Sequence, residues 1–349
     1  MKKINCSSIS KINTSVTVSK AKKFHSSSPH HTKEFVNTRT SGIFAPIATI
    51  FEDDFSISYK KTLKNVDMLI ESKKLKGLVV LGSNGEYPSL KSKEKIEVIE
   101  KVAHHVRTLH KNQCVLLAGT GSNSTEETIE VTKIAADAGY DAALVVTPYY
   151  YKPQLTEDAW IQHFTAVADA SPIPIIIYNV PNFTGVDIPV STIEKLVHLN
   201  NIIGIKESSG NIVKISELVN VSKQAEKKLH RHFNVMAGSG GYLLPALSVG
   251  AAGGIMALAN VFPAKCHKII ELFQTGKMDE ARELQNLLVP VNQAVTKNYG
   301  IPGLKYVLSK YGWQSSLPRP PLQPLSEKQR HDIDKILEHY EATKIALGL

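Results

Sequence analysis

The chain has 349 residues, of which 42% are hydrophobic and 21% are charged, as is usual for a globular protein with a sizeable core. No apolar run approaches the ~18 residues of a membrane-spanning helix, so we do not expect a membrane protein. The formal net charge is +9, but residues 1–33 contain seven lysines and no acid, which leaves +2 for the remainder. A nearly neutral body argues against a nucleic-acid-binding surface.

The three cysteines also exclude some classes of site. Cys6, Cys114 and Cys266 are few, odd in number and far apart in the chain. They form neither a disulfide framework nor a cysteine-based metal motif, and they suit a reducing compartment.

The first 33 residues have a composition of their own. They are rich in serine and lysine, lack acids, and contain no apolar core of signal-peptide length. This composition is typical of an organelle transit peptide. We therefore expect residues 1–40 to be a transit peptide or a disordered segment, and a tail without a targeting role is the alternative. His25, His30 and His31 lie in this segment and are expected to be solvated.

From Gly42 onward, short apolar runs rich in β-branched residues alternate with longer helical segments. Apolar runs without alternation predict strands buried on both faces, as in a parallel sheet covered by helices. Eight such units in about 230 residues predict an α/β fold, a (β/α)8 TIM barrel. The predicted strands are Ile43–Phe51, Gly77–Gly82, Cys114–Thr120, Ala142–Thr147, Ile173–Val180, Ile202–Glu207, Asn234–Gly238 and Gly254–Ala259.

The predicted helices continue beyond the eighth barrel unit. The segment at Ser124 opens with a serine that can cap the helix and two acids in its first turn. A proline-rich linker at residues 317–324 precedes the last helix. We expect a barrel domain over residues 41–276 and a C-terminal helical extension over residues 277–349. The predicted helices include Lys91–His110, Ser124–Ala138, Pro263–Thr275, Met278–Asn298, Pro302–Lys310 and one that begins near Ser326.

Polar residues gather where five of the predicted strands end. In (β/α)8 barrels the chemistry takes place at the carboxyl ends of the strands, so these segments are expected to converge on one site. The segments are Gly-Ser-Asn-Gly-Glu (82–86), Thr-Pro-Tyr-Tyr-Tyr (147–151), Tyr-Asn-Val-Pro (178–181), Lys-Glu-Ser-Ser-Gly (206–210) and Ala-Gly-Ser-Gly-Gly (237–241).

Lys206 stands at the end of an apolar strand, where a lysine is unusual. Strand alternation predicts that Ile203 and Ile205 face one way, while Ile202 and Lys206 face the other. A buried amine can attack a ketone as a Schiff-base nucleophile. The alternative is a lysine whose head group simply reaches water at the strand end, but the polar residues at the other strand ends favour the catalytic interpretation.

Other strand-end residues suggest supporting roles. Tyr178 carries a phenol that can transfer a proton, although it could equally be an ordinary amphipathic tyrosine. The glycines of segment 82–86 allow a tight loop with exposed N–H groups that suit a carboxylate, and Ser83 and Asn84 add donors. The three tyrosines at 149–151 could instead form a packing surface.

The predicted strand ends show no constellation for a metal or an organic cofactor. They carry no histidine pair at a metal-ligand spacing and no Asp/His cluster, and the chain has no glycine-rich phosphate-binding pattern. We therefore expect metal-independent chemistry.

The segments GSNGE (82–86), TPYYYKP (147–153), YNVP (178–181) and GIKESSG (204–210) together resemble the dihydrodipicolinate synthase / N-acetylneuraminate lyase superfamily. The resemblance covers about residues 42–324. It implies a class I, Schiff-base (β/α)8 aldolase that acts on a pyruvate-type 2-oxo acid without a cofactor, as a homotetramer.

The resemblance also implies roles for individual residues. Lys206 corresponds to the imine-forming lysine and Tyr178 to the proton-transfer residue. Tyr150 is the preferred match for a tyrosine that enters the neighbouring subunit's site, although the extra tyrosine at 151 leaves this assignment loose. Substrate-binding roles are implied for Ser83, Asn84, Ser208 and Gly238.

One position distinguishes members of the superfamily. Dihydrodipicolinate synthases generally carry an arginine two residues after the proline of YNVP, where this chain has Phe183. With Phe183 at this position, the chain is most similar to the mitochondrial 4-hydroxy-2-oxoglutarate aldolases. Three further segments support this similarity: AGSGG (237–241), ALANV (257–261) and AVTKNYGIPGLK (294–305). The implied function is cleavage of 4-hydroxy-2-oxoglutarate to pyruvate and glyoxylate in the mitochondrial matrix. The alternatives are a 2-keto-3-deoxy sugar-acid aldolase, an N-acetylneuraminate lyase, a dihydrodipicolinate synthase or a catalytically silent barrel.

Overall fold

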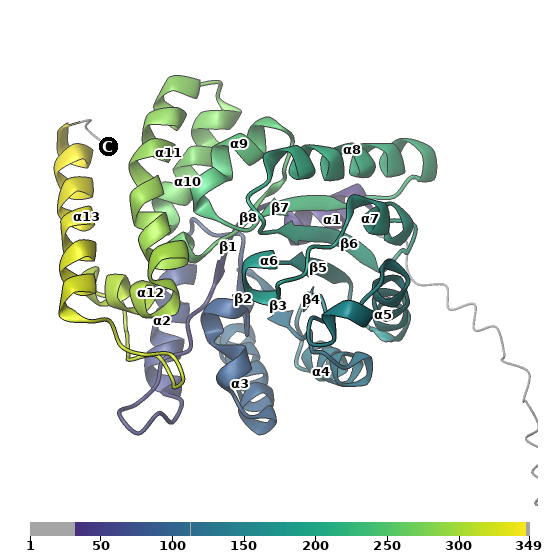
Figure 1. Ribbon diagram of the computed structural model, residues 1–349, viewed down its shortest axis with the longest axis horizontal. Helices are drawn as coiled ribbons and strands as arrows, with labels where there is room; N and C mark the ends of the chain where they lie inside the picture. Colours follow the sequence, from purple (N-terminus) through teal and green to yellow (C-terminus); the bar gives the residue numbers. More distant parts are fainter. Residues whose placement is uncertain (1–31, 112, 347–349) are drawn as a thin grey trace, which may run out of the picture.

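The computed structural model describes residues 32–111 and 113–346. Eight parallel strands form a closed barrel in sequence order, which confirms the predicted (β/α)8 fold (Figure 1). The strands are β1 (Gly42–Pro46), β2 (Gly77–Val80), β3 (Val115–Gly119), β4 (Ala142–Val146), β5 (Ile175–Asn179), β6 (Ile202–Glu207), β7 (Asn234–Ala237) and β8 (Gly253–Ile255).

Helices surround the barrel and continue beyond it as a C-terminal extension (Figure 1). The α-helices are α1 (Lys33–Thr40), α2 (Tyr59–Glu71), α3 (Ser92–His105), α4 (Thr125–Asp137), α5 (Glu157–Ala170), α6 (Pro181–Thr184), α7 (Val190–Leu196), α8 (Ile212–Leu229), α9 (Leu243–Ser248), α10 (Pro263–Gln274), α11 (Met278–Gln293), α12 (Gly300–Lys310) and α13 (Glu327–Ala346). Short 3-10 turns are η1 (Ser83–Gly85), η2 (Tyr87–Ser89), η4 (Lys152–Gln154), η5 (Gly240–Tyr242) and η6 (Ala257–Asn260), and the π-helical turns are η3 (Val106–His110) and η7 (Ala294–Asn298).

The hydrophobic core has two parts, as expected for strands buried on both faces. A smaller cluster fills the barrel and includes Phe44, Leu117, Ile176 and Met236. A larger cluster lies between the barrel and the surrounding helices. The carboxyl ends of the strands are thereby held in a ring by packing on both sides.

Strand β6 departs from the predicted alternation. Ile203 packs inside the barrel, whereas Ile202 and Ile205 pack on its outer side. The pairing register between β5 and β6 shifts at this point, so one residue of β6 is extra, as in a β-bulge. The prediction that Ile203 and Ile205 share a face was therefore wrong. Lys206 nevertheless lies on the inner side, because it lines the central cavity.

Seven of the eight strands are shorter than predicted, and β1 and β8 end furthest before their predicted ends. Strand β1 ends at Pro46, which has no N–H group to donate to a neighbouring strand. Strand β8 ends at Ile255 and is followed by the 3-10 turn η6. At the junction of β8 with β1, Gly253 has a φ of +149°, and a Cβ atom there would lie 2.1 Å from the carbonyl oxygen of Gly42. Only glycine allows the barrel to close so tightly at this position.

Helix α1 shows that the folded unit begins before residue 41, the predicted start of the barrel domain. The Thr32 hydroxyl caps this helix by accepting a hydrogen bond from the N–H of Phe35. Val36 is buried with the side chains inside the barrel, and the Asn234 side chain donates to the Thr40 hydroxyl over 3.0 Å. The predicted transit peptide falls mostly on residues 1–31, which lie outside the described residues, and it stays a prediction.

The C-terminal extension packs along one side of the barrel, where Figure 1 shows α13 beside α11. The rings of Phe262 and Tyr340 stack with their centroids 5.0 Å apart, which fixes α13 against the start of α10. Cys114 and Cys266 are free thiols buried in the core.

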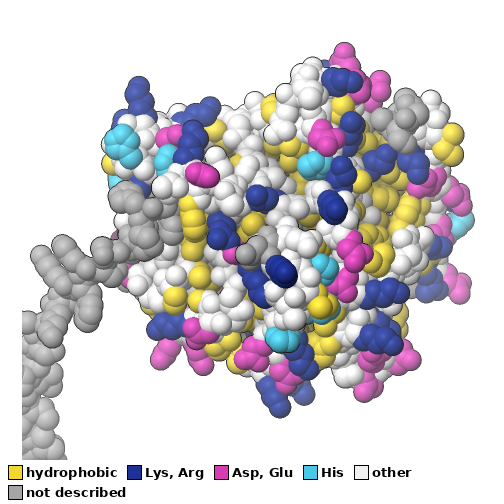
Figure 2. Space-filling model, turned by 180° about the vertical axis from the view of Figure 1, so that it is seen from behind, with side chains coloured by type: hydrophobic (Ala, Val, Ile, Leu, Met, Phe, Trp, Pro, Cys, Tyr) yellow, Lys and Arg dark blue, Asp and Glu magenta, His cyan; other side chains and the backbone are white. Residues whose placement is uncertain are grey.

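The surface view agrees with the nearly neutral charge of the body. On the face shown in Figure 2, lysine and arginine side chains are interspersed with aspartate and glutamate. None of the helices formed by the described residues has the length and apolar composition of a membrane-spanning segment.

Candidate active site

A cavity of about 520 Å³ opens at the carboxyl ends of the strands. It brings together six of the seven predicted site residues, and Tyr150 is the exception. Its lining from the barrel includes Pro46, Ser83, Asn84, Tyr178, Val180, Asn182, Phe183, Lys206, Ser208, Ser209, Gly238, Ser239 and Tyr242. Its lining from the C-terminal extension includes Val289, Asn292, Gln293, Thr296, Lys297 and Ile301.

Lys206 and Tyr178 form the centre of the cavity. They are paired neighbours on β6 and β5, and they are 4% and 5% exposed. The Lys206 Nζ atom lies 4.0 Å from the centroid of the Tyr178 ring. The Tyr178 hydroxyl lies 3.2 Å from Ser83 Oγ, a hydrogen bond in which either oxygen can donate. An amine, a phenol and a hydroxyl are thus aligned along one wall.

Two donors that line the cavity have no partner among the residues that the structure describes. Asn84 Nδ2 and Ser208 Oγ are buried and make no hydrogen bond. Buried polar groups are normally paired, so these two are free to bind a ligand. Ser83 and Asn84 also begin the 3-10 turn η1. The first hydrogen bond of this turn runs from the N–H of Gly85 to the carbonyl oxygen of Gly82. The turn therefore does not use the N–H groups of Ser83 and Asn84.

Gly238 gives Ser208 the space it occupies. A Cβ atom at residue 238 would lie 1.7 Å from Ser208 Oγ and 2.8 Å from Ser208 Cα. Any side chain at this position would therefore displace Ser208 from the cavity wall. Besides its predicted contact with substrate, Gly238 therefore has a steric role, because its lack of a side chain leaves room for Ser208.

A buried ion pair holds the loop that contains Ser83 and Asn84. Glu86 has a left-handed backbone, with φ of +55°, and its carboxylate lies 2.5 Å from the Lys305 ammonium of α12. Burial lowers the pKa of Lys305, and the Glu86 carboxylate acts against this shift. The backbone N–H of Arg319 donates to the second Glu86 oxygen over 2.8 Å. The C-terminal extension therefore fixes the geometry of the loop.

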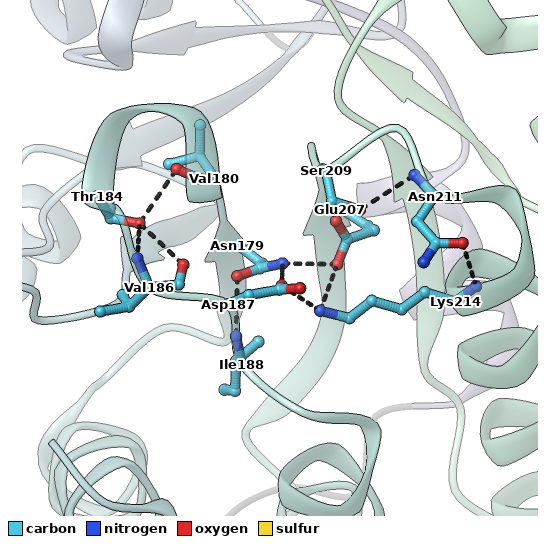
Figure 3. Close-up of polar contacts among 10 residues, drawn as sticks. All are labelled: Asn179, Val180, Thr184, Val186, Asp187, Ile188, Glu207, Ser209, Asn211 and Lys214. Atoms are coloured by element: carbon cyan, nitrogen blue, oxygen red, sulfur yellow. Dashed lines mark hydrogen bonds and ion pairs between the residues drawn. The ribbon is translucent and has the colours of Figure 1, made fainter.

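A second polar cluster supports β6 from its outer side (Figure 3). Glu207 is fully buried and accepts hydrogen bonds from Asn179 Nδ2, at 2.8 Å, and from the N–H of Ser209, at 2.6 Å. Lys214 of α8 contacts both Glu207 and Asp187. Because neighbouring strand residues face opposite ways, the cluster at Glu207 orients Lys206 without entering the cavity.

The tyrosine segment after β4 is divided between the interior and the surface. Asn123 Oδ1 accepts hydrogen bonds from the N–H groups of Tyr149 and Tyr150, at 2.8 and 3.0 Å. The side chain of Tyr149 makes a hydrogen bond with Tyr87. Burial raises the pKa of Tyr87, and the neighbouring Tyr149 and Tyr178 raise it further. Tyr150 is 71% exposed and packs edge-to-face on Tyr151, so a single chain does not bring it to Lys206.

Sequence reasoning missed several residues of the cavity. Asn292 of α11 exchanges hydrogen bonds with Ser239, and its Nδ2 lies 2.9 Å from Ser239 Oγ. The Tyr242 hydroxyl donates to the Glu207 carbonyl over 3.0 Å, and burial raises the pKa of Tyr242. Lys297 lies on η7 at the cavity. The signals for α11 and η7 were the Asn-Gln pair at 292–293, within an otherwise apolar run, and the segment AVTKNYGIPGLK (294–305), which contains Lys297.

Comparisons with known proteins agree with this geometry. The model of the dihydrodipicolinate synthetase family matches residues 39–340. The 4-hydroxy-tetrahydrodipicolinate synthase of Methanococcoides burtonii is 35% identical over 286 residues, which are 82% of this chain and 93% of that protein.

Solved structures show the same similarity. Dihydrodipicolinate synthase from Bacillus anthracis is 32% identical with a TM-score of 0.79, over 86% of this chain and 98% of that one. A prophage protein of the dihydrodipicolinic acid synthase family from E. coli, solved in complex with pyruvate, is 28% identical with a TM-score of 0.79, over 86% and 98%. From the family match and these identities, the chain belongs to the dihydrodipicolinate synthetase family of Schiff-base, pyruvate-type lyases.

Proposed function

We propose that the protein is a class I aldolase that reversibly cleaves 4-hydroxy-2-oxoglutarate to pyruvate and glyoxylate. The observation that carries this proposal is the cavity wall formed by Lys206, Tyr178 and Ser83, with the unpaired donors Asn84 Nδ2 and Ser208 Oγ beside it. An amine, a proton-transfer group and free donors for a carboxylate are what a 2-oxo acid needs to form an imine.

The proposed reaction begins at the C2 ketone. Lys206 Nζ attacks this carbon, and loss of water gives a protonated imine that withdraws electrons. The Tyr178 oxygen takes the proton of the C4 hydroxyl as its own proton passes along the hydrogen bond to Ser83 Oγ, the C3–C4 bond breaks, and glyoxylate leaves as an enamine forms. The enamine regains a proton at C3, and water hydrolyses the imine to release pyruvate and the free amine. Ser83 and Asn84 hold the carboxylate next to the ketone throughout.

The choice of second substrate rests on Phe183. This side chain lines the cavity and is 64% exposed, at the position where the synthases generally have an arginine. A phenyl ring cannot form the bidentate contact that a guanidinium makes with a carboxylate. This difference supports the aldolase over the synthase.

A synthase is the second candidate, and the named relatives favour it. The two functions are separated by supplying each substrate to the full-length protein. We expect pyruvate and glyoxylate to be released from 4-hydroxy-2-oxoglutarate, and no condensation of pyruvate with the aldehyde substrate of the synthases. Condensation without glyoxylate release would establish the synthase instead. Inactivity in both assays, with an imine still formed from pyruvate, would point to a sugar-acid or sialic acid substrate.

Lys297 is the candidate partner for the far carboxylate of a dicarboxylic substrate. Of the described residues that line the cavity, Lys206 and Lys297 are the cations, and Lys206 is committed to the imine. We expect Lys297→Gln to raise KM about 10-fold with little change in kcat, since one charge-assisted contact of ~1.5 kcal/mol is lost in ground state and transition state alike. Steady-state kinetics measure this split.

The matched control for Lys297 is Lys328→Gln, an exposed lysine of α13 that does not line the cavity. It should leave both constants unchanged. A KM for Lys297→Gln equal to that of the unaltered protein would assign the far carboxylate to another group.

Tyr150 is proposed to complete the proton relay in a neighbouring subunit of a homotetramer. Its exposure, and its place beside the anchored Tyr149, are consistent with a side chain that extends to another chain. We expect Tyr150→Phe to lower turnover by at least ~10²-fold, as for loss of a proton-transfer group. Tyr151→Phe, at the equally exposed neighbour, should change little. Full activity of Tyr150→Phe would remove the relay through this residue.

A further inference from the structure

Asp67, His105 and His110 form a polar cluster between α2 and α3. The Nε2 atoms of His105 and His110 each lie 2.6 Å from the same oxygen, Asp67 Oδ1. All three ligand atoms lie within 4.8 Å of one another. In the described part of the chain, this cluster is where three possible metal-ligating side chains lie close together. None of the three lines the cavity at the carboxyl ends of the strands.

The π-helical turn η3 creates the cluster. On an α-helix, residues three or four apart share a face, so a spacing of five would separate the two histidines. His105 ends α3 and His110 ends η3, whose i→i+5 pattern brings residues five apart onto one side. The two imidazole rings lie 6.0 Å apart and both reach Asp67. Such π-helical segments frequently occur at functional sites.

We propose that Asp67, His105 and His110 bind a zinc ion. Two imidazoles and a carboxylate are zinc ligands, with bonds of about 2.0–2.2 Å. Tetrahedral ligand atoms are then about 3.3 Å apart, so the present 2.6 Å contacts must widen by less than 1 Å. Each neutral ring carries its proton on Nδ1 in the bound form and turns the Nε2 lone pair to the ion. Water occupies the fourth position.

The surroundings suit a site that is formed in advance but accessible. The side chains of His110, His105 and Asp67 are 11%, 17% and 32% exposed. They are therefore held by packing while one side remains open to solvent. Asp67 belongs to α2 and both histidines to the end of the α3 segment, so the ion would link two helices of the barrel wall.

The position indicates a structural role. Helix α3 starts after the carboxyl end of β2 and leads back to the amino end of β3, so the cluster lies at the end of the barrel opposite the cavity. In such barrels the amino-terminal end serves stability and the carboxyl end serves catalysis. Zinc bound only by the native state raises its stability by RT ln(1 + [Zn²⁺]/Kd), which increases with the logarithm of the zinc concentration.

Zinc titration of the untagged, full-length protein after treatment with a chelator tests the proposal. Calorimetry should show one site, and the melting temperature should rise with zinc. The double variant His105→Ala/His110→Ala should weaken binding by more than ~100-fold, beyond the 10–100-fold loss typical of outer-shell partners. His104→Ala, an exposed neighbour on α3, is the matched control and should bind normally.

The N-terminal histidines require a second control. A variant with His25, His30 and His31 replaced by alanine keeps the proposed site and should bind zinc as the unaltered chain does. If the double variant does not fold, Asp67→Asn takes its place, and Co²⁺ absorption reports whether the ion has lost a ligand. Equal zinc affinity in the unaltered protein and in the site variants would overturn the proposal. Imine formation from pyruvate should persist in chelator, so failure of the aldolase proposal would be seen separately.

Discussion

Replacing Lys206 with arginine or alanine should abolish imine formation and lower turnover on the order of 10⁶-fold, as for loss of a covalent nucleophile elsewhere. The amine lies at the centre of the cavity, 4.0 Å from the Tyr178 ring, and its strand is supported by the Glu207 cluster on the opposite face. Arginine keeps the positive charge but cannot form the imine, so it separates covalent chemistry from electrostatics. Borohydride trapping with pyruvate, followed by peptide mapping, measures the adduct.

The trapping experiment also identifies the reacting lysine. The unaltered protein should carry the reduced adduct on Lys206, whereas Lys297, the other cavity lysine, should remain unmodified. Circular dichroism of the Lys206 variants should be unchanged, because one strand-end side chain does not determine the barrel. An adduct that persists in Lys206→Ala would place the nucleophile elsewhere, and no adduct in the unaltered protein would revive the silent-barrel alternative.

Replacing Tyr178 with phenylalanine should leave pyruvate binding intact and lower kcat by ~10²–10⁴-fold, the range for a positioned acid or base. This loss corresponds to about 2.7–5.5 kcal/mol of transition-state stabilisation. The Tyr178 hydroxyl is the group that links the ring beside Lys206 to Ser83 Oγ, at 3.2 Å. The ring itself remains in the variant, so the packing around Lys206 is preserved. Borohydride trapping of the variant measures imine formation, and an assay of glyoxylate release measures bond cleavage, so the two steps are separated.

A matched control exists in the core. Tyr140 is buried and its hydroxyl donates to the Ile99 carbonyl over 3.1 Å, outside the cavity. Tyr140→Phe also removes one buried hydroxyl and should cost about 1 kcal/mol of stability without lowering kcat. Equal kcat values for Tyr178→Phe and the unaltered protein would return Tyr178 to a packing role.

Much of the geometry of the candidate site is predictable because it depends on local patterns. Strands buried on both faces read as continuous apolar runs, and parallel strands place their carboxyl ends on one edge. Ser83, Tyr178 and Lys206 could therefore be assigned to one site from their places at strand ends. The loop after β2, with the proposed carboxylate-binding residues, was likewise visible as two glycines around Ser83 and Asn84.

Local patterns do not reveal which distant segments support these residues. The Glu86–Lys305 ion pair and the Asn292–Ser239 contact join the barrel to the C-terminal extension, and the sequence predicted this extension without any contact to the barrel. The bulge at Ile203 arises from the pairing of β5 with β6 and broke the predicted alternation.

The sequence by itself determined the barrel, the edge that carries the candidate site and the residues at its strand ends, because each follows from a run of neighbouring residues. Only the tertiary structure showed that α1 belongs to the folded unit, that α11 and η7 wall the cavity, and that Asp67 meets two histidines through a π-helical turn. The physical reason is that these contacts join segments far apart in the chain, or depend on a local change of helical pitch, and neither leaves a periodic pattern in the sequence.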